Sequence, residues 1–323
     1  MKGKYEIIVK DVHIQYKFTI SRNITILRGD SATGKTTLID MISAYQSNGL
    51  SSGVSIKSDK RCVVLTGVNW QVNLEHINDS IVFIDEGEMF VRSKEFAKVI
   101  QGSSNYYVIA TRTSLFDLPY SVNEIYGIRN TSGNRYQGTK RLYSQFYRIY
   151  GENINNISKP DVAILEDSNA GFEFFESVCK AQGIKCISAR GKSNIYKMVC
   201  GCEEKNILII ADGAAFGPEM ERVLSLSRVK QIVLYLPESF EWIILSKGLV
   251  DGKRVSDIIE APEKYIESKQ FFSWEQFFTK LLVDETKDTY LHYGKSKLNE
   301  NYLRSREKAV IIKKMDAIGE ILS

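Results

Sequence analysis

The stretch Gly29-Asp-Ser-Ala-Thr-Gly-Lys-Thr36 constrains this chain more than any other part of it. It fits the pattern G-x-x-x-x-G-K-[ST], in which glycines let the backbone curl so that N–H groups point at phosphates. An apolar segment over 23–28 precedes it, and a segment with helical spacing over 35–46 follows it. This order predicts a strand, a phosphate-binding loop and a helix whose N-terminus favours negative charge. We therefore expect a nucleotide to bind here.

Each residue of this loop has an expected role in holding a nucleotide. Lys35 should reach the β- and γ-phosphates of ATP, and the Thr36 hydroxyl should ligate Mg²⁺. The candidate nucleotide-binding residues are Gly29, Asp30, Ser31, Ala32, Thr33, Gly34, Lys35, Thr36 and Thr37.

A second motif is expected to complete the nucleotide site. Four apolar residues over 81–84 end on Asp85 and Glu86, which is similar to a Walker B strand. Asp85 would hold Mg²⁺ through water, and Glu86 would orient or deprotonate the attacking water. The alternative is a surface acid pair at the end of a strand. The loop at 29–36 favours the catalytic interpretation.

The apolar segment over 106–110 ends on Thr111 and Arg112. In P-loop ATPases the strand after Walker B often carries a polar residue that senses the γ-phosphate, and Thr111 is the candidate. Arg112 is a candidate for binding phosphate within the chain or in a neighbouring subunit. The alternative for Arg112 is a salt bridge with the Asp85–Glu86 region.

Together, these motifs resemble the ABC/OLD-like group of ATPases. The chain departs from that group in two respects. Only about fifty residues separate the two Walker motifs, which leaves no room for a coiled-coil arm, and no LSGGQ-like signature precedes Asp85. A P-loop kinase or motor with an unrelated Rossmann-like domain is the other enzyme class to consider.

The segment over 125–151 contains no acidic residue. It holds five basic residues interleaved with tyrosines and Phe146, and its Asn130-Thr-Ser-Gly-Asn134 stretch predicts the turn of a hairpin. Basic and aromatic side chains together are typical of surfaces that bind phosphates and stacked bases. The alternative is an exposed hairpin whose tyrosines pack on the sheet below.

A polar stretch over 151–160 predicts a linker, and a second alternating series of strands and helices follows it. Apolar strands are expected over 161–166, 184–189, 206–211 and 229–236, with helices over 169–182, 193–200 and 217–227 between them. Strand–helix alternation in both halves predicts α/β architecture with mostly parallel sheets. Glu166 ends the first of these four strands and Asp212 follows the third.

This second series resembles the Toprim domain of topoisomerases, primases and OLD-family nucleases. That family places a glutamate after its first strand and Asp-x-Asp after its third, and these acids ligate Mg²⁺. The resemblance implies a metal site at Glu166 and Asp212, but Ala214 stands where the second aspartate would be. Candidates to compensate are Glu219, Glu238 and Glu241. The alternatives are a helix-capping role for Glu166–Asp167 and a turn role for Asp212.

The expected organisation is an ATPase domain over 1–150, a Toprim-like domain over 160–240 and a helical C-terminal region over 241–323. The net charge of +4 does not by itself indicate nucleic acid. The five cysteines do not have the spacing of a zinc site, so we expect reduced thiols. The sequence has no apolar run of about 18 residues, so we expect no membrane span. We therefore expect a cytoplasmic protein.

An ATPase joined to a Toprim-like domain resembles a compact member of the OLD family. The resemblance implies ATP-controlled action on nucleic acid, often in bacterial defence against phage or mobile DNA, and assembly into an oligomer. One alternative is an ATPase switch whose Toprim-like module is not catalytic and binds a partner protein or nucleic acid. Ala214 favours that alternative.

Overall fold

The structure is a computed structural model, and it describes residues 1–29, 33–131, 141–151, 159–246, 248–250, 252–313 and 315–322. The chain divides into two compact units. Unit 1 comprises Met1–Gly151 and Glu263–Phe272, and unit 2 comprises Glu152–Pro262 and Ser273–Ser323. The α/β architecture expected from the sequence is confirmed in both units.

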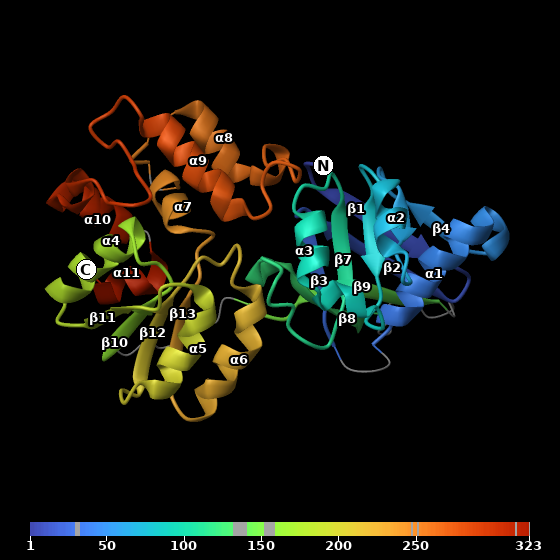
Figure 1. The fold of residues 1–323 in the computed structure, drawn as a ribbon, viewed down its shortest axis with the longest axis horizontal. Coiled ribbons are helices and arrows are strands. Elements are labelled where there is room, and N and C mark those ends of the chain that lie inside the picture. The colour runs from blue at the N-terminus through green and yellow to red at the C-terminus, as the bar shows by residue number, and fades with distance from the viewer. Residues whose placement is uncertain are drawn as a thin grey trace. The chain divides into compact units, whose positions relative to one another are not determined.

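Unit 1 is built on a mixed sheet that has nine strands in the described residues, in the order β4-β1-β2-β9-β8-β3-β7-β6-β5 (Figure 1). The strands are β1 (Tyr5–Lys10), β2 (Ile14–Ile20), β3 (Ile24–Leu27), β4 (Ser55–Lys57), β5 (Cys62–Val64), β6 (Ile81–Ile84), β7 (Tyr106–Ala110), β8 (Ile125–Asn130) and β9 (Leu142–Arg148). The α-helices are α1 (Lys35–Asn48), α2 (Trp70–Glu75) and α3 (Lys94–Ile100), with 3₁₀ turns at η1 (Gly49–Ser52), η2 (Met89–Arg92) and η3 (Val122–Glu124).

The central strands of unit 1 are buried on both faces. Successive side chains of a strand point to opposite faces, so each strand contributes to two cores. On one face, the core around α1 includes Ile81, Phe83, Tyr106 and Val108. On the other face, the core around α2 and α3 includes Val82, Ile84, Tyr107 and Ile109. Because both faces are covered, these strands are continuous apolar runs in the sequence.

The strand order brings the ends of β3 and β6, which precede the two motifs expected from the sequence, to one edge of the sheet. Strands β3, β7, β6 and β5 are parallel neighbours, so their carboxyl ends lie at the same edge. Strand β7 lies between β3, which precedes Gly29, and β6, which precedes Asp85. The residues that follow β7 therefore lie between the two motifs.

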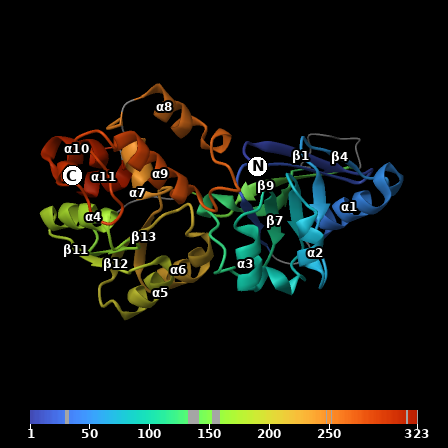
Figure 2. The same cartoon turned by 45° about the horizontal axis from the view of Figure 1, so that its top comes forward.

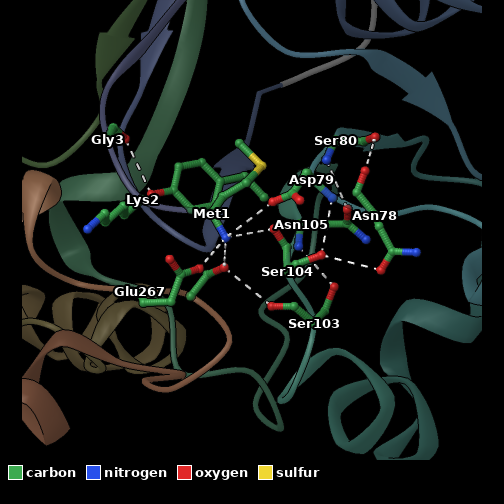
Figure 3. Close-up of polar contacts among 12 residues, drawn as sticks. Met1, Lys2, Gly3, Asn78, Asp79, Ser80, Ser103, Ser104, Asn105 and Glu267 are labelled. Carbon is green, nitrogen blue, oxygen red and sulfur yellow. Dashed lines mark hydrogen bonds and ion pairs between the residues drawn. The ribbon is translucent and has the colours of Figure 1, made fainter.

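The segment Glu263–Phe272 belongs to unit 1 although it lies far along the chain. The amine of Met1 donates to the Glu267 carboxylate and to the Ser268 hydroxyl, as Figure 3 shows for Glu267. The same amine donates to the carbonyl oxygen of Ser104 at 2.8 Å. The Asn23 amide donates to the carbonyl oxygens of Ser268 and Phe271. These contacts attach the segment to the end of the sheet where β3 begins.

Unit 2 contains a parallel sheet with the strand order β11-β10-β12-β13 in the described residues. The strands are β10 (Val162–Leu165), β11 (Lys185–Ser188), β12 (Asn206–Ile210) and β13 (Gln231–Tyr235). The α-helices are α4 (Ala170–Ala181), α5 (Lys192–Gly201), α6 (Met220–Ser225), α7 (Phe240–Leu245), α8 (Lys253–Glu260), α9 (Trp274–Thr286), α10 (Ser305–Lys313) and α11 (Asp316–Leu322). Short 3₁₀ turns of unit 2 are η4 (Gly217–Glu219), η5 (Leu226–Arg228) and η7 (Glu300–Leu303), and η6 (Pro262–Lys264) lies where the chain passes from unit 2 to unit 1.

Helices cover both faces of this sheet. Figure 1 and Figure 2 show α5 and α6 on one face, and α4 with α10 and α11 on the other. From β10 the chain passes to β11 on one side, and it then crosses to β12 and β13 on the other side. The strand order therefore reverses between β10 and β12. In open α/β sheets a ligand site is expected at such a reversal, beyond the carboxyl ends of the strands.

The helical region expected over 241–323 does not form a separate body. Most of it belongs to unit 2, whereas Glu263–Phe272 belongs to unit 1. The hairpin expected over 125–151 is present as the antiparallel pair β8 and β9, and the turn residues 132–134 lie outside the described residues. None of the helices in the described part of the chain is both long and apolar enough to cross a membrane.

Candidate functional site

Lys35 lies at the first position of α1, directly after Gly34. Its side chain is buried, and its ammonium donates to the Gly29 carbonyl oxygen at 2.6 Å and to the Thr33 hydroxyl at 3.2 Å. Gly34 has a φ of 92°, a left-handed conformation that glycine adopts without strain. The Tyr16 hydroxyl donates to the Gly34 carbonyl oxygen at 2.9 Å. Asp30, Ser31 and Ala32 lie outside the described residues.

Glu86 lies next to Lys35. The Lys35 ammonium is 3.9 Å from one Glu86 carboxylate oxygen. Asp85 is half-buried, and its carboxylate accepts a hydrogen bond of 2.8 Å from the Glu86 backbone N–H. The structure therefore brings together Lys35 and Glu86 from the ends of β3 and β6.

Thr111 and Arg112 follow β7 and differ in what they contact. Thr111 is buried, and its hydroxyl donates to the Thr113 carbonyl oxygen and accepts from the Thr113 N–H. That hydroxyl is used within its own turn. Arg112 forms an ion pair of 2.7 Å with Glu86, which is the alternative that the sequence left open for it.

The residues around Lys35 have the donors and acceptors that a magnesium nucleotide requires. Thr36 and Thr37 are both exposed at the start of α1. A hydroxyl at Thr36 and a carboxylate at Asp85 are oxygen ligands of the kind that Mg²⁺ prefers. The buried cation of Lys35 suits the negative charge of phosphate. These side chains fit the group that the motif implies.

A second candidate site lies at the carboxyl ends of β10 and β12 in unit 2. A cavity of about 310 Å³ opens there, at the reversal of strand order. Acidic side chains outnumber basic ones in its lining. The acidic residues are Glu166, Asp167, Asp212, Glu241 and Glu275, and the basic residues are Arg190 and Lys295.

Glu166 and Asp212 are neighbours, because β10 and β12 are adjacent parallel strands. The Asp212 backbone N–H donates to a Glu166 carboxylate oxygen at 3.1 Å. Burial, with the negative charge of Glu275, raises the pKa of Glu166 to about 7. Burial and the charges of Glu275 and Glu166 raise the pKa of Asp212 well above its usual range. Both carboxyl groups therefore resist ionisation.

Asp167 caps a helix, which is the alternative role that the sequence suggests for Glu166–Asp167. Its carboxylate accepts hydrogen bonds from the backbone N–H groups of Ser168, Asn169 and Gly171. These bonds satisfy donors at the N-terminus of α4. Asn169 occupies the N-cap position, but its side chain makes no capping bond. The carboxylate of Asp167, rather than the side chain of Asn169, caps this helix.

The proposed substitutes for the missing second aspartate have different positions. Ala214 is buried, and Glu219 is buried in an ion pair with Arg222. Glu241 lines the cavity, and its carboxylate accepts a hydrogen bond of 2.9 Å from the Tyr293 hydroxyl. Neither Glu219 nor Glu238 is part of the cavity lining that the described residues form. Only Glu241 of the three candidates lies at this site.

Two residues of the cavity come from the C-terminal part of the chain, and no sequence pattern predicts either of them as a site residue. Glu275 is in the first turn of α9, and Lys295 follows that helix. Burial opposes the charge of Lys295, yet the acids Glu241, Asp212 and Glu275 raise its pKa. Neither residue belongs to a sequence motif. A charged residue in the helical C-terminal region is usually exposed to solvent, so the sequence alone does not indicate a site.

The acidic cavity has the chemistry of a metal site but not the arrangement of one. Among the described residues, no group of three or more His, Cys, Asp or Glu side chains is placed to hold a metal ion. Lys295 already supplies positive charge at the cavity. The geometry therefore does not fit a ready-made Mg²⁺ site at Glu166 and Asp212.

Comparisons with known proteins do not assign this chain to a family. No protein-family model, no curated protein and no solved structure matches it.

Proposed function

We propose that unit 1 binds ATP with Mg²⁺ and hydrolyses it. The observation that carries this proposal is the position of the buried Lys35 ammonium 3.9 Å from the Glu86 carboxylate. A cation for the phosphates and an acid for the attacking water are the two groups that phosphoryl transfer to water needs side by side. The strand order supports it, because β3, β7 and β6 end at one edge of the sheet.

In this proposal each side chain has one task. Lys35 binds the β- and γ-phosphates, Thr36 and Asp85 hold Mg²⁺, and Glu86 orients or accepts a proton from the attacking water. The metal neutralises charge on the phosphates when the nucleotide is bound.

Release of inorganic phosphate from ATP by the purified chain tests this function. Lys35→Ala and Glu86→Gln should each lower kcat by about 100-fold or more, since each removes a group that acts on the transferring phosphate. Lys98→Ala, which removes a lysine from the exposed side of α3, is the matched control and should leave turnover unchanged. Phosphate transferred to a small molecule instead of water would indicate the kinase alternative.

We infer that unit 2 is a Toprim-like module on which the nucleotide state of unit 1 acts. The strand order β11-β10-β12-β13 and the adjacent acids Glu166 and Asp212 support this inference. The resemblance implies nucleic acid as the ligand, with the basic strands β8 and β9 as a further contact surface. Defence against phage or mobile DNA in an oligomeric assembly is the corresponding biological role.

The geometry favours binding over cutting in unit 2. Ala214 provides no ligand, and no group of three acids in the described residues is placed for a metal. Incubation of labelled DNA and RNA with the chain, ATP and Mg²⁺ should leave both intact. Cleavage that disappears in Glu166→Ala and Asp212→Ala would establish instead that this unit is a metal-dependent nuclease.

A further inference from the structure

The carboxylate of Glu86 is held by cations on both of its oxygens. The Arg112 guanidinium approaches one oxygen at 2.7 Å through Nη2 and donates to the other at 3.2 Å through Nε. Lys35 Nζ lies 3.9 Å from the second of these oxygens. Arg112 therefore binds Glu86 through two N–H donors. The planar guanidinium matches the geometry of a carboxylate in this way, which a lysine ammonium cannot do.

Sheet register explains why these two side chains meet. Strands β6 and β7 are parallel neighbours, and Ile84 is in register with Ile109. Glu86 follows β6 by two residues and Arg112 follows β7 by two, so both extend from the same edge. The Glu86 side chain is 25% exposed and that of Arg112 is 55% exposed. A ligand approaching this edge can therefore reach Arg112 more easily than Glu86.

The ion pair opposes the role assigned to Glu86. A carboxylate that accepts two charge-assisted hydrogen bonds has less negative charge available for a water molecule. Since Arg112 contacts both oxygens of Glu86, a water molecule placed for attack can use this carboxylate as an acceptor in full only when Arg112 moves away. The arrangement therefore points to a restraint on hydrolysis.

We propose that Arg112 is a positioning residue that restrains ATP hydrolysis by holding Glu86, and that a phosphate group releases Glu86 by drawing Arg112 away. This inference rests on the proposed ATPase function. The ligand class is a phosphate, because a guanidinium binds phosphate with the same two-donor geometry with which it binds a carboxylate. The restraint is expected in kcat, which is measured with ATP already bound, so the releasing phosphate is assigned to a second ligand, the backbone of a nucleic acid.

The test compares the steady-state ATPase kinetics of the wild-type chain with those of Arg112→Ala, Arg112→Lys and Arg92→Ala. Arg112→Ala should raise kcat by about twofold to fivefold with little change in KM, since an exposed ion pair stabilises the restrained state only modestly. Arg112→Lys, which retains charge without the fork, should fall between the two. Arg92, exposed at the end of η2, controls for the loss of one positive charge. A melting temperature for each protein verifies folding.

A single-stranded oligonucleotide tests the release of Glu86. The oligonucleotide should raise kcat of the wild-type chain towards that of Arg112→Ala and leave the variant unchanged. If it has no effect on either protein while Arg112→Ala remains faster, the release by a nucleic-acid phosphate is overturned.

Two results would overturn the inference. A lower kcat and a higher KM in Arg112→Ala, with turnover intact in the wild-type chain, would show that Arg112 assists catalysis directly and would leave the ATPase proposal standing. Absence of hydrolysis in both proteins would overturn the ATPase proposal and this inference together.

Discussion

Replacing Glu166 by glutamine tests whether the acidic cavity of unit 2 is destabilised by its own charges. The substitution keeps the size of the side chain and an oxygen that can accept the hydrogen bond from the Asp212 N–H. It removes only the ability to ionise. Any pH-dependent difference between the two proteins therefore reports the charge of residue 166.

The direction follows from the raised pKa of Glu166. Because folding raises this pKa from 4.5 to about 7, the folded state binds more protons than the unfolded state between those values, and stability falls as pH rises through them. The full penalty, at about 1.36 kcal/mol for each pH unit, is roughly 3 kcal/mol above pH 7. The actual penalty is smaller than this value, since the Glu166 side chain is only half-buried and water screens its charge.

Urea unfolding at pH 4.5 to 8, in the presence of a chelator, measures the difference. The fluorescence of Trp242 and Trp274, which both belong to unit 2, reports the transition. Glu166→Gln and the wild-type chain should have nearly equal stability at the acid end, and the variant should be more stable by up to about 3 kcal/mol above pH 7. A difference that stays constant with pH, or a wild-type chain that gains relative stability as pH rises, would refute the reasoning.

Two further substitutions test the packing that positions the sites. Gly213→Ala should destabilise unit 2 by about 1–3 kcal/mol in urea unfolding, because its new Cβ would lie 2.3 Å from the Leu236 carbonyl oxygen. The control Gly201→Ala places its Cβ in open space and should leave stability unchanged. Equal stabilities of the two variants would contradict this account. Ser93→Ala should cost about 1 kcal/mol, measured from the unfolding of unit 1, because the Ser93 hydroxyl accepts from the Phe96 N–H at the start of α3. An unchanged midpoint would show that this cap does not contribute.

Much of the fold can be predicted from the sequence because its central strands are buried on both faces. Runs such as 81–84 and 106–110 are continuously apolar, and each ends on polar residues at the sheet edge. Local pattern and burial agree in these runs, so strand positions follow from the sequence. The division of the helical tail does not follow, because contacts such as that of Glu267 with Met1 join residues distant in the chain.

The candidate sites differ in how far the sequence predicts them. Lys35 and Glu86 are found from motifs, because phosphate binding requires a particular spacing around one loop. Glu275 and Lys295 could not be found in this way, since only the packing of the C-terminal helices brings them to the cavity. The Arg112–Glu86 pair was one of two open alternatives, and strand register decides in favour of the ion pair.

The most direct test of the central claim compares ATP binding with ATP turnover in Glu86→Gln. Calorimetric titration with Mg²⁺ and ATP measures binding, and release of phosphate in a single turnover measures the chemical step. If unit 1 is an ATPase in which Lys35 binds phosphate and Glu86 acts on water, the variant should bind ATP at least as tightly as the wild-type chain and hydrolyse it about 100-fold more slowly. Unchanged hydrolysis in Glu86→Gln, or ATP binding that is unaffected by Lys35→Ala, would contradict the account.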